Sequence, residues 1–153
     1  MSAELFRLSD DEAVAIAEVA TAFAQVLPPD RRGVYEELAG AAADGGIDPE
    51  LVPELERVCA LALETGRARQ LGKAETERLV TAVHRRTPGG QALTTETADV
   101  NKVLAGLSGK TLQKARITCR MPGRYQLDVV VDGIDLAISI EPEGLDVRSL
   151  QTG

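Results

Sequence analysis

The sequence predicts an α+β fold, in which about four N-terminal helices precede a fifth helix packed on a four-stranded antiparallel β-meander. Two observations carry this prediction. Apolar residues recur at steps of three and four through most of the first 107 residues, which is the period of a helix. From Lys114 onward they recur at every second position, which is the period of a strand. A sheet with one apolar face needs a cover, and the helices are the segments that can supply it.

Proline and glycine residues divide the N-terminal part of the chain into four predicted helices. The first opens on a capping box formed by Ser9 and Glu12. The third begins where Asp48 can cap and Pro49 can occupy the first helical position. The predicted bounds are about 10–27, about 30–43, 48–66 and about 73–86.

The segment Thr87-Pro88-Gly89-Gly90 is predicted to break the chain. Thr95 is then expected to cap the fifth helix, which should end near residues 106–109. We therefore expect a helical region at 1–87 and a helix-plus-sheet region at 91–153, either as separate parts or as one continuous domain.

The four predicted strands cover residues 114–121, 125–131, 134–140 and 145–150. A two-residue Asp132-Gly133 turn pairs Leu127 with Ile138. A four-residue loop at 141–144 then pairs Ile138 with Val147. These two turns place every inward apolar residue opposite another.

A three-residue loop at 122–124 is predicted to join the first two strands. It pairs Cys119 with Leu127 and Met121 with Tyr125, again placing inward residues opposite each other. On the polar face, the same register sets Lys114 across from Asp132.

The composition is that of a globular chain and excludes several classes of protein. The 153 residues are 44% hydrophobic and 27% charged, so the chain is too apolar to be disordered, and it contains no run long enough to cross a membrane. The start lacks the features of a secretory signal, so we expect a cytoplasmic protein. Two Cys, one His and no Trp exclude a disulfide scaffold, a thiolate-rich zinc module and a histidine metal centre, and we expect no cofactor.

Charge is distributed unevenly along the chain. Residues 1–66 carry 14 acidic and 4 basic side chains, residues 67–124 carry 4 acidic and 12 basic, and residues 125–153 carry 6 acidic and 1 basic. This asymmetry predicts a basic interaction surface in the middle of the chain. Its candidate residues are Arg67, Arg69, Lys73, Arg78, Arg85, Arg86, Lys110, Lys114, Arg116 and Arg120.

No linear motif specifies catalysis. Gly109-Lys110-Thr111 matches the end of a phosphate-binding loop, but it follows a helix and precedes a strand, the reverse of what such a loop requires. His84 is expected at a solvated helix end, where a positive charge is favourable. Cys59 and Cys119 are expected to be small buried side chains rather than nucleophiles.

The leading functional hypothesis is a non-catalytic protein–protein interaction or assembly module that forms homodimers, with another protein or a second copy as its partner and no membrane. The first alternative is a nucleic-acid-associated regulator that uses residues 67–124, although this stretch has no aromatic residue for base stacking. The second alternative is an enzyme whose site has no recognisable motif.

Overall fold

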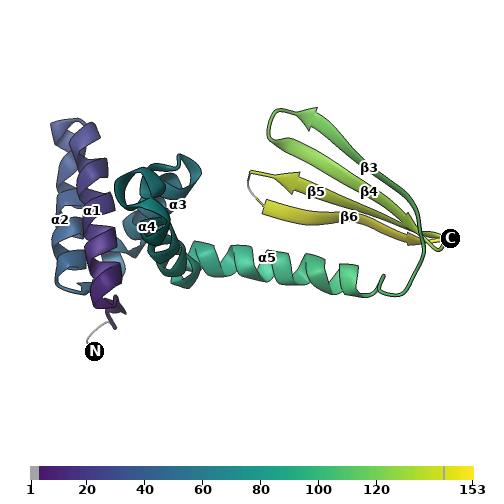
Figure 1. Cartoon of the computed structure of the whole chain (residues 1–153), viewed down its shortest axis with the longest axis horizontal. Coiled ribbons are helices and arrows are strands. Elements are labelled where there is room, and N and C mark those ends of the chain that lie inside the picture. The colour runs from purple at the N-terminus through teal and green to yellow at the C-terminus, as the bar shows by residue number, and fades with distance from the viewer. Residues whose placement is uncertain (1–3, 143) are drawn as a thin grey trace. The chain divides into compact units, whose positions relative to one another are not determined.

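The computed structural model describes residues 4–142 and 144–153 and confirms the predicted α+β architecture (Figure 1). Glu143 of the predicted 141–144 loop lies outside the described residues. The chain divides into two compact units, residues 1–91 and residues 92–153. Each unit contains its own cluster of buried apolar side chains.

The first unit packs its helices around one apolar core. Its elements are β1 (Phe6–Arg7), α1 (Asp10–Val26), α2 (Pro29–Ala43), β2 (Gly46–Ile47), the 3₁₀ turn η1 (Pro49–Leu51), α3 (Val52–Glu64) and α4 (Arg67–Arg86). Helices α1 and α2 lie side by side (Figure 1). Fully buried side chains come from all four helices and from β2, and the largest of them include Ile16, Leu38, Ile47, Leu55 and Val80.

Helix α1 begins as the sequence predicts. The Glu12 amide donates to the Ser9 hydroxyl at 3.3 Å, and the Ser9 amide donates to the Glu12 carboxylate at 3.0 Å. This capping box satisfies two of the amides that a helix start leaves without intrahelical partners. The two-residue strands β1 and β2, which pair Phe6 with Ile47, were not predicted.

The boundaries of the fourth and fifth helices differ from the prediction. Helix α4 begins at Arg67, and Gly72 and Lys73 interrupt it with non-helical backbone angles. Helix α5 (Pro88–Ala105) begins seven residues before Thr95. The buried Thr87 explains this early start, because its hydroxyl accepts a hydrogen bond from the Gly90 amide at 3.3 Å, as an N-cap does.

The second unit contains most of α5 and an antiparallel sheet with the order β3-β4-β5-β6. The Asp132-Gly133 turn is confirmed: both residues have positive φ, 47° and 78°, as a type I′ turn requires. The predicted pairs of Ile138 with Leu127 and with Val147 are also confirmed. The strands are β3 (Leu112–Met121), β4 (Arg124–Val131), β5 (Ile134–Glu141) and β6 (Gly144–Thr152).

The predicted register between β3 and β4 is wrong by two residues. Only Pro122 and Gly123 form the turn, and an irregularity follows between Cys119 and Met121. Cys119 therefore pairs with Tyr125 instead of Leu127. From Lys114 to Cys119 the shift of two residues keeps each side chain on its predicted face, because the faces of a strand alternate with a period of two. Met121 is the exception: it pairs with Arg124 instead of Tyr125, which places it on the polar face rather than the predicted apolar one.

The shifted register also separates Lys114 from its predicted partner. Lys114 lies opposite Val130, and the Asp132 carboxylate instead accepts a hydrogen bond from the Thr111 amide at 3.0 Å. Arg116 is the basic residue of β3 that faces a carboxylate directly, since it pairs with Asp128.

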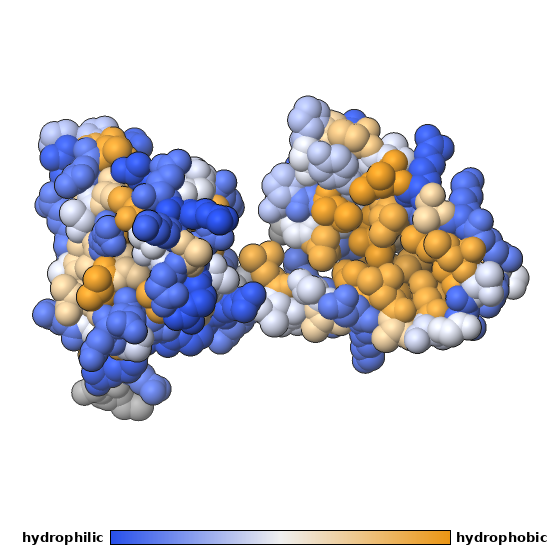
Figure 2. Space-filling view, in the orientation of Figure 1, coloured by the Kyte–Doolittle hydropathy of each residue, from blue (hydrophilic) through white to orange (hydrophobic). Residues whose placement is uncertain are grey.

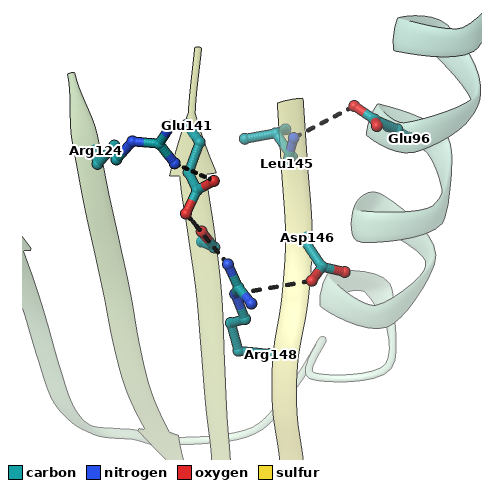
Figure 3. A network of polar contacts seen from close by, with 7 residues as sticks. Glu96, Arg124, Glu141, Leu145, Asp146 and Arg148 are labelled. Carbon is teal, nitrogen blue, oxygen red and sulfur yellow. Dashed lines mark hydrogen bonds and ion pairs between the residues drawn. The ribbon is translucent and has the colours of Figure 1, made fainter. Parts of the chain in front are cut away.

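Helix α5 packs on the apolar face of the sheet, as predicted. Val100 of α5 forms a buried cluster with Leu136 and Ile138 of β5. Partly buried side chains surround this cluster, and they are Val103, Leu107, Leu127, Ile140, Leu145 and Val147. The Glu96 carboxylate of α5 also accepts a hydrogen bond from the Leu145 amide at 3.3 Å (Figure 3).

Candidate interaction surfaces

The apolar face of the sheet is covered only in part. Leu112 and Ile117 of β3 and Tyr125 of β4 are 59%, 64% and 41% exposed. Cys119, which pairs with Tyr125, is exposed as well. Figure 2 shows hydrophobic residues gathered over this sheet. We call Leu112, Ile117, Cys119 and Tyr125 the open patch.

The width of the sheet explains why the open patch is left bare. Neighbouring strands lie about 4.8 Å apart, so the axes of β3 and β6 are separated by about 14 Å. A helix with its side chains is only about 10–12 Å across. Because α5 packs against Leu136 and Ile138 of β5, its cover does not extend over β3.

The two cysteines lie in opposite environments, and the prediction for Cys119 is wrong. Cys59 is fully buried in the helical core, where burial, helped by the nearby Glu56 carboxylate, raises the pKa of its thiol to about 12. Cys119 points to the predicted face, but that face carries no cover at this position. Exposure makes Cys119 the accessible thiol of the chain.

The opposite face of the sheet is polar and carries a connected ion-pair network (Figure 3). The Glu141 carboxylate accepts hydrogen bonds from Ser139 at 2.9 Å, Arg124 at 2.8 Å and Arg148 at 3.2 Å. Together, the Ser139 hydrogen bond and the two guanidinium groups lower the pKa of Glu141. Arg148 also lies 3.8 Å from Asp146.

The ten residues of the predicted basic surface are divided between the two units. The helical unit holds Arg67, Arg69, Lys73, Arg78, Arg85 and Arg86, whereas the sheet unit holds Lys110, Lys114, Arg116 and Arg120. Two of them are engaged by carboxylates of their own unit. Arg78 pairs with Glu75 at 2.6 Å, and Arg86 pairs with Glu12 at 2.6 Å.

Arg86 has a structural setting that the sequence did not indicate. Besides Glu12, its guanidinium donates to the Arg7 carbonyl at 2.9 Å and lies 4.9 Å from the centre of the Phe6 ring. The Arg86 side chain thus joins the end of α4 to β1 and to the capping box of α1. Arg86 therefore holds β1 against the end of α4, and its charge is engaged within the helical unit.

In the sheet unit, Lys114 and Arg116 stand beside acidic residues. They line a depression of about 320 Å³ on the polar face together with Asp128 and Asp135. Within the described part of the chain, neither Lys114 nor Arg116 makes an ion pair shorter than 4.0 Å. The mixed signs make this depression a poor phosphate-binding surface.

Among the described residues of the helical unit, Phe23 lines a pair of neighbouring cavities. The first, of about 390 Å³, lies between α1 and α3 and is mostly apolar, with Arg67 among its lining residues. The second, also about 390 Å³, is lined by Tyr35, Glu54 and Arg57. The Tyr35 hydroxyl donates to Glu54 at 2.8 Å, and burial raises the pKa of Tyr35. No local pattern in the sequence predicts either cavity, because each is assembled from separate helices.

The described residues contain no group of three or more His, Cys, Asp or Glu side chains arranged to hold a metal ion. None of the helices within that part of the chain is both long and apolar enough to span a membrane. Comparison with known proteins finds no matching family, no matching characterised protein and no matching solved structure.

Proposed function

We propose that this protein is a non-catalytic assembly module that self-associates by covering the open patch with a second copy of the chain. The observation that carries the proposal is the exposure of Leu112, Ile117 and Tyr125 on the same sheet face that α5 covers elsewhere. A contiguous apolar surface bordered by polar residues is typical of a protein interface.

A second copy is favoured as the partner because each chain carries both an uncovered apolar sheet surface and exposed apolar side chains on α5 that could cover it. The open patch offers a bare sheet surface, and Leu93 and Leu104 of α5 are 45% and 38% exposed. A two-fold axis would let the helix of each copy contact the open patch of the other. Such an isologous contact closes on itself and gives a dimer rather than a filament.

The charges on β3 favour packing through the face over pairing through the strand edge. Lys114, Arg116 and Arg120 all lie on this outer strand. If β3 paired with β3 of a second copy, cations would face cations across the ladder, which is destabilising. Positive side chains on an edge strand are a common defence against such pairing.

The energetics predict a weak dimer. Burying a whole Leu or Ile side chain contributes about 1.5–3 kcal/mol, so covering Leu112, Ile117 and Tyr125 contributes roughly 1–1.5 kcal/mol for each residue. Two copies together gain roughly 6–9 kcal/mol, against a cost of association of about 4–15 kcal/mol. Contacts around the open patch, including those of Leu93 and Leu104, therefore decide the affinity.

Sedimentation equilibrium of the full chain tests the proposal. The wild-type protein should change from monomer to dimer between about 1 μM and about 1 mM. Ile117→Lys should remain monomeric, because it places a charge in the buried part of the contact. Thr118→Lys is the matched control: it adds the same charge to the neighbouring position of β3, on the opposite face, and should still dimerise.

Any of three outcomes would refute this proposal. The first is a wild-type monomer throughout the concentration range. The second is equal dimerisation of the wild type and of Ile117→Lys, which would place the contact elsewhere on the chain. The third is loss of dimerisation in both Lys variants, which would show that the apolar face of the sheet is not the contact surface.

A further inference from the structure

The apolar cavity between α1 and α3 has the composition of a ligand site. Its volume of about 390 Å³ lies within the range of small-molecule pockets, which are mostly apolar with a few placed polar groups. Its walls come from both helices and include Val19, Ala22, Phe23, Val26, Val58 and Leu61.

The apolar walls are partly held in place and partly left without a partner. The Phe23 ring packs edge-on against Tyr35, with ring centres 4.8 Å apart and an angle of 76° between the planes. Tyr35 is fixed in turn by its hydrogen bond to Glu54. Val26, by contrast, is 74% exposed at the end of α1. A ligand in the cavity would cover this side chain.

The polar lining residues come from the end of α3 and the start of α4, and the one charge among them is positive. They are Thr65, Arg67 and Gln70, and no carboxylate is among the lining residues. The Arg67 guanidinium donates to Gln70 at 3.3 Å, and within the described residues it has no carboxylate within 4.0 Å. Arg67 therefore retains donors for an anion.

We propose that this cavity binds a small amphiphilic carboxylate, with its aliphatic body between α1 and α3 and its carboxylate at Arg67. The charge of Arg67 selects this class of ligand. A cationic amphiphile would be repelled, because its head group would lie beside the Arg67 guanidinium. A neutral amphiphile would lack the charge-assisted hydrogen bond that a carboxylate accepts from Arg67. Because Arg67 is exposed, its ion pair with the carboxylate gives roughly a two- to fivefold preference for the anion.

Calorimetric titration of the full chain with decanoate, below its micelle concentration, tests this site. Decanoate should bind one molecule per chain, roughly two- to fivefold more tightly than decanol, which has the same aliphatic body without the charge. Arg67→Gln should reduce decanoate binding to the level of decanol. Arg69→Gln, an exposed cation of the same helical turn that does not line the cavity, should bind decanoate as the wild type does.

A second variant tests the cavity rather than the charge. Ala22→Phe fills the apolar space from the α1 side and should abolish binding of both decanoate and decanol, while circular dichroism shows an unchanged helix content. Ile117→Lys, in the open patch of the other unit, should bind decanoate normally. This last control separates the ligand site from the proposed self-association.

Each contrary result would overturn the inference. Absence of decanoate binding, or equal affinity for decanoate and decanol, would remove the role of the charge. Binding that persists in Ala22→Phe, or that is lost in Ile117→Lys, would place the amphiphile on another apolar surface. Loss of binding in Arg69→Gln equal to that in Arg67→Gln would indicate a general effect of positive charge.

Discussion

Ile117 and Leu127 lie directly opposite each other across the β3–β4 ladder, but only Leu127 packs against the cluster beneath α5. Ile117 is 64% exposed, and Leu127 is partly buried. At this pair the edge of the helical cover therefore runs between β3 and β4, whereas at Tyr125 the start of β4 is left uncovered as well. This boundary within one apolar face is the structural basis of the proposed assembly function.

The buried side of that boundary should dominate the stability of the sheet unit. Leu136→Ala removes a side chain that is 2% exposed and should lower the free energy of unfolding by about 2–5 kcal/mol, because it leaves a cavity. Leu112→Ala makes the same change in the open patch and should cost only about 0.5 kcal/mol. Denaturant unfolding at low protein concentration measures both variants, and equal losses would contradict the assignment of the cover.

The contacts of Arg86 predict a difference between two adjacent arginines. Arg86→Gln loses the ion pair with Glu12 and should lower the free energy of unfolding by about 1–2 kcal/mol, a modest value because the guanidinium is half exposed. Arg85→Gln, at an exposed position, should change it by less than about 0.5 kcal/mol. If urea unfolding gave equal values for the two variants, Arg86 would have no special structural role.

Two glycine substitutions should have effects of opposite sign. Gly133 has φ +78° in the Asp132-Gly133 turn, so Gly133→Ala should lower the unfolding free energy by about 1–2 kcal/mol. Gly33 lies in α2 with open space around its Cβ position. Gly33→Ala should raise stability by about 0.5–1 kcal/mol, since alanine loses less backbone freedom in a helix. Thermal unfolding followed by circular dichroism measures both, and a shift in the same direction would refute the argument.

The buried Cys59 thiol predicts a loss of stability at alkaline pH. Its pKa is about 12 in the folded protein, whereas the unfolded thiol ionises near pH 9. Between these values the unfolded state releases the proton first, so the unfolding free energy falls as pH rises, by up to about 1.4 kcal/mol per pH unit. Urea titrations at several pH values should show a shallower decline for Cys59→Ala than for the wild type. Parallel declines would contradict the predicted linkage.

The elements that the sequence predicted well are those that depend on neighbouring residues. Ser9 and Glu12 specify the start of α1 within one turn, and Asp132-Gly133 specifies a hairpin whose register then follows by alternation. Side-chain faces in the sheet were also predictable. From Lys114 to Cys119 they survived the wrong β3–β4 register, because the two-residue shift preserved the alternation, and only the irregularity before Met121 changed a face.

The features that were missed depend on residues far apart in the chain. The glycines at 89 and 90 indicate a break when read locally, but the Glu56 carboxylate accepts a hydrogen bond from the Gly89 amide at 2.8 Å and supports the start of α5. The Arg86 contacts join segments more than 70 residues apart. The open patch depends on which strands α5 covers, and this follows from the width of the sheet rather than from any motif.

The rate at which an alkylating reagent modifies Cys119 reports whether a second copy covers the open patch. Cys119 is exposed on this surface, and Cys59 is buried, so modification with excess iodoacetamide follows one thiol. The proposed dimer predicts that the wild-type rate falls severalfold between about 1 μM and about 1 mM protein, while the rate for Ile117→Lys stays constant. A wild-type rate that is the same at every protein concentration would show that no second copy covers this surface.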